Sequence, residues 1–231
     1  MEIVNASQLE SRPHTYLIYG KPGIGKTSTM KHAKGKVLHL DIDRLSGVLQ
    51  GQDHIDIAFI DNIKTFDSWN KTVADIVRDY SGKYDYIVID NISELERCIL
   101  SHLGREGKNQ GVPAMGDYQR MQFKVVDSIR YLKNSGANVV VMAWEEFDQF
   151  TDASGQTFTM ASPRLNKKIM DNVAGLCDCV ARLVINAEGE RGFILQPSNS
   201  TYAKNQIDDR KGCLQSELFD HETTTVSEEA S

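Results

Sequence analysis

Continuous apolar runs alternate along the chain with apolar residues at helical spacing, and this alternation predicts strands and helices in turn. The runs predict buried strands at Thr15–Tyr19, Val37–Asp41, Tyr84–Asp90 and Asn138–Ala143. Helical spacing predicts helices over about 25–35, 66–80, 92–103 and 117–133. Alternation of this kind is typical of an α/β fold with a mostly parallel central sheet flanked by helices.

The remaining segments complete the predicted organisation. We expect a loop at Gly104–Gly116, a hairpin over Phe150–Met160 turning at Asp152–Gly155, and a helix around residues 165–173. Strands at Cys179–Ile185 and Gly192–Gln196 around Glu188-Gly189 predict a C-terminal β-hairpin. The domain boundaries that follow are an N-terminal extension at 1–14, one domain at 15–216 and an acidic, disordered tail at 217–231.

A glycine-rich segment follows the first predicted strand and opens the first predicted helix. It matches the P-loop pattern G-x-x-x-x-G-K-[ST] in full, and its residues, with the one that follows, are Gly20, Lys21, Pro22, Gly23, Ile24, Gly25, Lys26, Thr27 and Ser28. Glycines let successive N–H groups point at phosphate oxygens, and a helix N-terminus adds partial positive charge. We expect Lys26 to reach the β- and γ-phosphates of ATP and the Thr27 hydroxyl to bind Mg²⁺.

A second magnesium-binding residue is expected at the end of a neighbouring strand. Tyr86-Ile-Val-Ile-Asp90 places a carboxylate after four apolar or aromatic residues, so Asp90 is the candidate; capping of the next helix by Asp90 or Asn91 is the alternative. Asn91 is not the glutamate that many ring ATPases use as a general base. Asp41 and Asp43 project to one side of an extended chain, and either one can orient the attacking water or cap the strand end.

Composition places few restrictions on these interpretations. The net charge is −6, but 217–231 contain five acidic residues and no Lys or Arg, which leaves only −1 for the first 216 residues. A nucleic-acid partner is therefore compatible with the charge. The four cysteines form no CxxC pair, which argues against zinc. The lack of a long apolar stretch or signal-peptide pattern favours a soluble, cytoplasmic protein without membrane contact.

Together these motifs resemble the RecA-like P-loop NTPases, and more closely the phage nucleotide-binding proteins with a bare RecA-type core that act in single-strand annealing. The resemblance spans about Thr15 to Lys211. It implies that Asp43, in Asp41-Ile-Asp43, is the catalytic acid, with Asp in place of the usual Glu. It also implies that Lys204, in Ala203-Lys204-Asn205-Gln206, acts on the nucleotide of a neighbouring subunit in a ring or filament. An ordinary surface turn is the alternative for Lys204.

The resemblance further implies two DNA-binding loops and a sensor of the γ-phosphate. The loops correspond to 104–116 and 148–168, where the basic candidates are Arg105, Lys108, Arg164, Lys167 and Lys168. At the sensor position stand Trp144 and Glu145 instead of the usual Gln or His, which favours a core role for Trp144. The overall expectation is a weak, Mg²⁺-dependent ATPase that binds ATP or ADP, oligomerises and binds single-stranded DNA.

Two other functions fit the same P-loop. A partition-type ATPase would use Lys21, which stands at the position of that group's signature lysine, whereas a solvated loop lysine is the plainer interpretation. A small-molecule or nucleoside kinase would need an arginine-rich lid, and 148–168 offer only Arg164.

Overall fold

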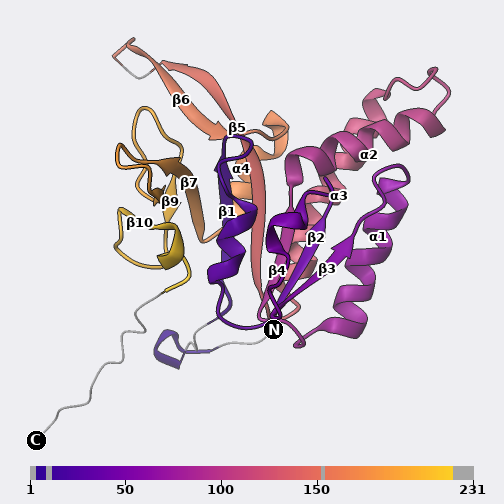
Figure 1. Ribbon diagram of the computed structural model, residues 1–231. Helices are drawn as coiled ribbons and strands as arrows, with labels where there is room; N and C mark the ends of the chain where they lie inside the picture. Colours follow the sequence, from indigo (N-terminus) through magenta and orange to yellow (C-terminus); the bar gives the residue numbers. More distant parts are fainter. Residues whose placement is uncertain (1–3, 9–11, 152–153, 221–231) are drawn as a thin grey trace, which may run out of the picture.

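A computed structural model describes residues 4–8, 12–151 and 154–220. Its sheet has the strand order β10-β8-β7-β1-β5-β4-β2-β3, with β6 paired to β5 and β9 to β7 (Figure 1). The strands are β1 Thr15–Gly20, β2 Val37–Asp41, β3 Ile55–Phe59, β4 Tyr86–Asp90, β5 Asn138–Thr151, β6 Thr157–Pro163, β7 Cys179–Ile185, β8 Arg191–Ile194, β9 Lys204–Asn205 and β10 Gly212–Leu214. The α-helices are α1 Thr65–Asp75, α2 Ile92–Glu106, α3 Met115–Lys133 and α4 Lys167–Leu176.

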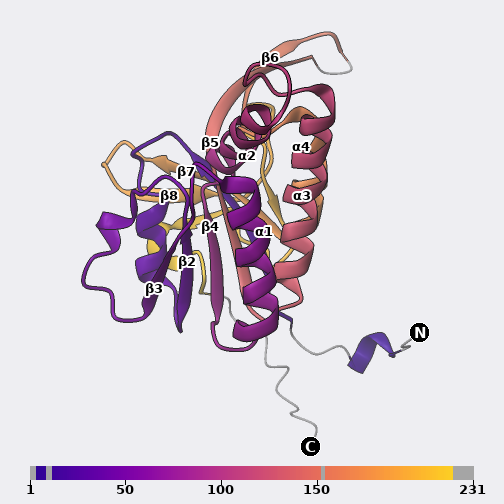
Figure 2. The same ribbon diagram turned by 90° about the vertical axis from the view of Figure 1, so that its right-hand side faces the viewer.

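The central strands β7, β1, β5, β4, β2 and β3 run parallel. At the C-terminal end, β8 and β9 pair antiparallel with β7, and β10 pairs antiparallel with β8. All four α-helices lie on one face of the sheet (Figure 2). The other face is covered by short 3₁₀ turns and the C-terminal residues, which bury side chains such as Met30, Leu49 and Phe193. This is the predicted α/β fold with a mostly parallel sheet, and burial of both faces explains why β1, β2 and β4 are largely apolar.

Three predicted elements differ in type or length. The segment after the P-loop forms a 3₁₀ helix, Thr27–His32, in place of an α-helix over 25–35. Thr27, Ser28 and Thr29 begin it, and hydroxyl side chains compete for backbone hydrogen bonds and so weaken α-helix. The strand predicted at 138–143 continues to Thr151 and pairs with β6, which forms the expected hairpin; Asp152 and Ala153 of its turn lie outside the described residues. The pattern gives no prediction for β3, a half-exposed edge strand.

The loop predicted at 104–116 is shorter than its composition suggests. Helix α2 continues to Glu106 and α3 begins at Met115, so Gly104 and Arg105 are helical. A Cβ on Gly104 would lie 2.6 Å from the Gly111 carbonyl oxygen and 2.9 Å from the Pro113 nitrogen. Gly104 therefore serves close packing of the helix against the connection and is not a loop signal.

The folded chain also extends further than the predicted boundary at residue 217. A 3₁₀ turn spans Gln215–Glu217, and Leu218 and Phe219 are only 1% and 6% exposed. The Phe219 ring packs edge-on against Tyr16 and Tyr86. The domain therefore extends at least to Asp220, and residues 221–231 lie outside the described part of the chain.

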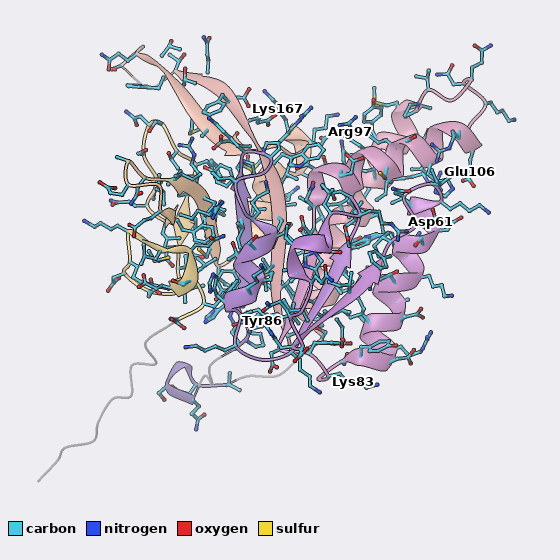
Figure 3. All side chains as sticks on the ribbon, viewed as in Figure 1. Asp61, Lys83, Tyr86, Arg97, Glu106 and Lys167 are labelled. Atoms are coloured by element: carbon cyan, nitrogen blue, oxygen red, sulfur yellow. The ribbon has the colours of Figure 1, made fainter. Side chains whose placement is uncertain are left out.

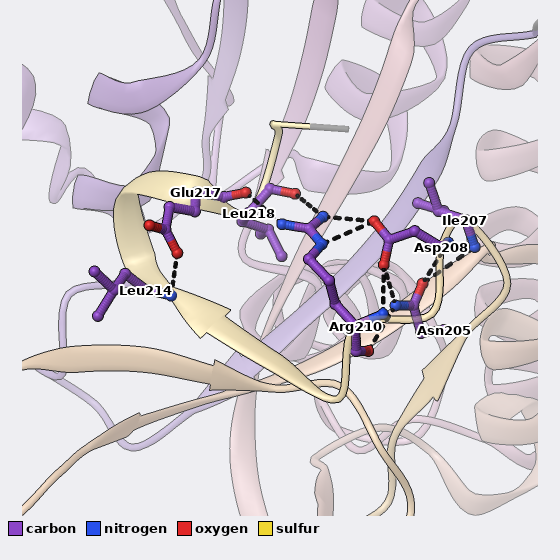
Figure 4. Close-up of polar contacts among 7 residues, drawn as sticks. All are labelled: Asn205, Ile207, Asp208, Arg210, Leu214, Glu217 and Leu218. Atoms are coloured by element: carbon purple, nitrogen blue, oxygen red, sulfur yellow. Dashed lines mark hydrogen bonds and ion pairs between the residues drawn. The ribbon is translucent and has the colours of Figure 1, made fainter. Parts of the chain in front are cut away.

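Arg210 anchors this C-terminal segment (Figure 4). Its guanidinium group donates to the carbonyl oxygens of Glu217 and Leu218, at 2.8 and 3.4 Å, and pairs with Asp208 at 2.7 Å. Burial of Asp208 opposes ionisation, but hydrogen bonds from Arg210 and Asn205 outweigh it and hold the pKa of Asp208 well below its usual range. An ionised Asp208 thus keeps Arg210 in place to bind the end of the domain.

Candidate nucleotide-binding site

The P-loop leaves the carboxyl end of β1 and curves around a cavity of about 450 Å³. Gly23 and Gly25 have φ angles of 77° and 109°, in the left-handed region that glycine adopts without strain. Two carbonyl groups of the loop are bonded to distant parts of the chain: Ile24 O accepts from Arg191 at 2.7 Å, and Gly25 O accepts from the Gln215 side chain at 2.7 Å. A loop whose carbonyls are bonded elsewhere offers its N–H groups to an anion.

Lys26 lies inside the curve of this loop. Its ammonium group donates to the carbonyl oxygens of Gly20 and Lys21, at 2.9 and 3.1 Å, and the residue is 7% exposed. Burial lowers the pKa of Lys26, while the negative charges of Asp90, Asp43 and Glu145 oppose that shift. A buried cation surrounded by carbonyls and carboxylates is well placed to bind an anion that enters the loop.

Thr27 and Asp90 meet at the edge of the cavity. The Thr27 hydroxyl donates to Asp90 Oδ2 at 2.6 Å, and Asp90 is the last residue of β4. A hydroxyl and a carboxylate beside a phosphate-binding loop are hard oxygen ligands of the kind that Mg²⁺ prefers. The donor set therefore fits magnesium, with Thr27 and Asp90 as the protein ligands.

The structure gives Asp41 and Asp43 different roles. Asp41 accepts backbone hydrogen bonds from Arg44, Leu45 and Ser46, at 2.7, 3.3 and 3.2 Å, so it caps the turn after β2. Both aspartates line the cavity, but Asp43 accepts from the Asn91 side-chain amide at 2.6 Å and has its second oxygen buried without a partner among the described residues. Burial, together with the negative charges of Asp90, Asp41 and Glu94, raises the pKa of Asp43 to about 6.

Asn91 connects Asp43 to the start of helix α2. Its side-chain oxygen accepts from the Glu94 N–H at 2.9 Å and caps helix α2, and its amide nitrogen holds Asp43. Helix capping was the alternative for this position, and the structure assigns it to Asn91 rather than to Asp90. An amide side chain can accept from the helix N–H and donate to Asp43 at the same time, whereas an ionised glutamate can only accept.

Pattern analysis does not identify His39, which lies beneath Asp90. The imidazole is fully buried on β2, with Nε2 3.4 Å from Asp90 Oδ2. His39 stands two residues before Asp41, so the period of the strand places both on one face of the sheet. The two-residue period of the strand is the sequence signal for His39. Whether His39 lies near Asp90 or is only a core residue depends on the pairing of β2 with β4, which requires the strand order.

Trp144 lines the cavity where β5 leaves the sheet beside the P-loop. The guanidinium groups of Arg97 and Arg164 lie 5.9 and 5.7 Å from its ring centre, within the range of cation–π contacts. Glu145 points to the other side and pairs with Arg182 at 2.7 Å. Trp144 is thus a half-buried wall of the site and not simply a core residue.

The other predicted site residues lie apart from the cavity. Lys204 is on β9, and its ammonium group donates to the carbonyl oxygens of Ala174 and Cys177, at 3.3 and 2.6 Å, at the end of α4. Arg105 bonds to Ser101 and to the Ile63 carbonyl, and Lys167 pairs with Asp148 at 3.1 Å. Lys21 is exposed on the outer side of the P-loop, near Glu145 and Arg182.

One further cluster has the composition of a metal site but not its chemistry. Asp67, His102 and Glu106 bring three possible ligand atoms together. His102 Nδ1 accepts a hydrogen bond from the Phe66 N–H at 3.0 Å, so Nε2 carries the proton and donates toward Glu106 at 3.1 Å. A nitrogen that holds a proton is not free to bind a metal, and the cluster is a hydrogen-bonded contact between α1 and α2.

The P-loop geometry, the Thr27–Asp90 pair and the parallel sheet define a P-loop NTPase, a class that binds a nucleotide with Mg²⁺. The family model described as an AAA domain matches residues 12–207, so the chain belongs to this family. No curated protein shows a significant match. Among solved structures, the chain is similar to a KaiC-like protein from the hyperthermophilic archaeon Pyrococcus horikoshii OT3. The match covers 78% of this chain and 77% of that protein's chain, with 14% sequence identity and a TM-score of 0.45. No helix of the described residues is long and apolar enough to cross a bilayer.

Proposed function

We propose that the chain is a Mg²⁺-dependent ATPase that self-associates and binds single-stranded DNA during recombination or strand annealing. The observation that carries the ATPase is the contact of Thr27 with Asp90 at the mouth of the loop that encloses Lys26. In this proposal Lys26 neutralises the β- and γ-phosphates, and Thr27 and Asp90 hold the ion.

Asp43 is the residue that we assign to the attacking water. It lines the same cavity as Lys26 and Asp90, and the hydrogen bond from Asn91 fixes its side chain. A carboxylate whose pKa lies near 6 is largely ionised at neutral pH yet basic enough to accept a proton. Its short side chain is consistent with slow turnover.

Lys26→Ala tests the ATPase proposal. The variant should lose ATP binding, measured by calorimetry, and phosphate release. Lys36→Ala, an exposed lysine that precedes β2 at the amino ends of the strands, is the control and should behave as the unchanged chain. Normal turnover by Lys26→Ala would contradict the assignment of the P-loop as the catalytic site.

Comparing two further lysine variants separates the RecA-like proposal from the partition-type alternative. If Lys204 completes the site of a neighbouring subunit, Lys204→Ala lowers hydrolysis and nucleotide-dependent oligomerisation while Lys21→Ala does not. Because Lys204 bonds to the end of α4 within its own chain, thermal melting must accompany the assay. Loss of activity in Lys21→Ala alone would favour the partition-type ATPase.

The DNA-binding part of the proposal is supported by the position of basic residues. The β5–β6 hairpin and the connection between α2 and α3 both project from the end of the molecule where the parallel strands finish (Figure 1). Figure 3 shows Arg97 and Lys167 at that end and Lys83 at the opposite one. Lys108 and Lys168 are exposed and have no ion pair within the described residues, so their charge is available to phosphates.

A gel shift with an unstructured oligonucleotide at low salt tests DNA binding. Lys108→Ala combined with Lys168→Ala should weaken binding several-fold and flatten its salt dependence. Lys36→Ala combined with Lys83→Ala removes the same charge from the opposite end and should have little effect. Failure of the unchanged chain to bind at low salt would remove DNA from the proposal and leave the ATPase untouched.

A further inference from the structure

Arg191 is placed on the P-loop by a segment far from it in the sequence. It is the first residue of β8, and the antiparallel pairing of β7 with β8 matches it with Ile185. Because β7 pairs directly with β1, the strand that leads into the P-loop, this hairpin lies beside the loop. Arg191 Nε donates to the Ile24 carbonyl oxygen at 2.7 Å.

The side chain lies across the loop and reaches the cavity. It lines the cavity together with Pro22, Gly23 and Lys26. A Cβ added to Gly25 would lie 2.9 Å from Arg191 Nε and 3.2 Å from its Cδ. Gly25, the second fixed glycine of the G-x-x-x-x-G-K-T pattern, thus lets the guanidinium group lie against the backbone, in addition to adopting a left-handed conformation.

The hydrogen bond to Ile24 uses only part of the donor capacity of Arg191. A guanidinium group has five N–H donors in a planar fork, and no described residue accepts from its terminal nitrogens or forms an ion pair with it. The residue is exposed, so these nitrogens face the solvent at the cavity mouth. An arginine held by Nε, with its fork open beside a phosphate-binding loop, has the geometry for bidentate contact with phosphate oxygens.

We infer that Arg191 binds the phosphates of the nucleotide, as a second cation supplied by the same chain in addition to Lys26. The inference rests on the proposed nucleotide binding and adds a residue to it. Lys26 lies inside the loop and Arg191 on its outer rim, so the two cations approach a bound polyphosphate from different sides. A nucleoside diphosphate or triphosphate is the ligand class that this arrangement fits.

Bracing of the loop is the alternative role for Arg191, and a glutamine variant separates the two roles. Arg191→Gln keeps an N–H donor on a side chain of similar length but removes the charge. Mg·ATP and Mg·ADP are titrated by calorimetry into the full chain and into Arg191→Gln, Arg191→Lys and Arg191→Ala, at several salt concentrations. Arg130→Gln, which removes an exposed arginine from α3, is the control for charge.

Arg191→Gln and Arg191→Ala should each weaken ATP binding about tenfold, as expected for a lost charge-assisted hydrogen bond. Their affinity should also depend less on salt, because a charged contact is screened and a neutral one is not. Arg191→Lys should lie between them and the unchanged chain.

Binding by Arg191→Gln with the affinity and salt dependence of the unchanged chain would overturn the inference and leave Arg191 as a brace. Absence of ATP binding by the unchanged chain itself would overturn nucleotide binding and this inference together. Melting temperatures close to that of the unchanged chain would show that the variants are folded.

Discussion

At the residue scale, two aspartates in one short motif carry different tasks. Asp41 and Asp43 are separated by one residue, have the same chemical group and both line the cavity, yet Asp41 accepts three backbone N–H bonds while Asp43 accepts from the Asn91 side chain. The difference arises because the chain turns at Arg44, whose φ of 62° brings the following N–H groups back onto Asp41. Strand alternation alone cannot reveal such a turn.

Asp43→Asn should lower the rate of ATP hydrolysis by about 10² to 10⁴, the usual contribution of a general base, while ATP affinity changes little. With the pKa of Asp43 near 6, hydrolysis by the unchanged chain should rise with pH through that value, since only the ionised carboxylate accepts a proton. Steady-state phosphate release between pH 5 and 8 measures both effects.

Asp41→Asn is the matched control for this prediction. It should lower the free energy of unfolding by about 1–3 kcal/mol, because it weakens the capping of the turn. Hydrolysis should persist, with its pH dependence moved toward lower pH, because the charge of Asp41 no longer raises the pKa of Asp43. Equal rates for Asp43→Asn and the unchanged chain would contradict the role of Asp43.

At the element scale, a buried carboxylate joins α2 to the start of α4. Glu96 on α2 accepts from the Asn166 N–H with both oxygens, at 3.3 and 3.0 Å, and Asn166 in turn caps α4. Burial raises the pKa of Glu96 to about 7; the Asn166 hydrogen bond opposes this shift and the charge of Glu146 adds to it. The helix that carries Lys167 and Lys168 thus starts from a proton-sensitive contact.

Glu96→Gln should stabilise the protein at high pH. The folded state holds the Glu96 proton to about pH 7 and the unfolded state only to about pH 4.5. Ionisation therefore costs stability progressively between these values, up to about 3 kcal/mol above pH 7, and nothing below pH 4.5. Urea unfolding should show that the variant gains much more stability over the unchanged chain at pH 8 than at pH 5. A constant difference would show that Glu96 does not titrate in this window.

At the scale of the whole molecule, the C-terminal segment is part of the nucleotide-binding domain. Gln215 bonds to Gly25 O and to the Thr29 hydroxyl, at 2.7 and 2.9 Å, and Phe219 packs against Tyr16 and Tyr86 of the sheet. Gln215 therefore supports the backbone of the P-loop, and Phe219 packs on the sheet beneath it. Truncation experiments must distinguish this segment from the residues that follow it.

Truncation after Ser216 should destabilise the domain and weaken ATP binding, whereas truncation after Asp220 should do neither. Phe219→Ala isolates the apolar contribution and should cost about 3–5 kcal/mol of unfolding free energy, the usual range for a buried phenylalanine. Urea unfolding of the three variants provides the measurement. Equal stability of the two truncated chains would contradict the packing of Leu218 and Phe219.

Most of the fold was predictable because parallel strands buried on both faces leave continuous apolar runs. The helix predicted after the P-loop was wrong in type. An α-helix usually follows this motif, but three consecutive Ser or Thr residues weaken it here and a 3₁₀ helix forms. The predicted domain boundary at residue 217 lies too early in the chain. Leu218 and Phe219 are buried, but two adjacent apolar residues show no helical or strand periodicity that would predict it. Neither error affects the identity of Lys26, Thr27 and Asp90.

The sequence by itself determined the phosphate-binding loop and the α/β fold. The loop depends on a fixed spacing of Gly, Lys and Thr in one short segment, and the strands and helices depend on the spacing of apolar residues along the chain. Only the tertiary structure decided that Asn91 holds Asp43 while Asp41 caps the turn, that His39 lies next to Asp90, and that Arg191 and Gln215 bond to the loop from more than 160 positions away. These contacts depend on the order of strands in the sheet. Strand order is set by the burial of the whole core, and no local pattern records it.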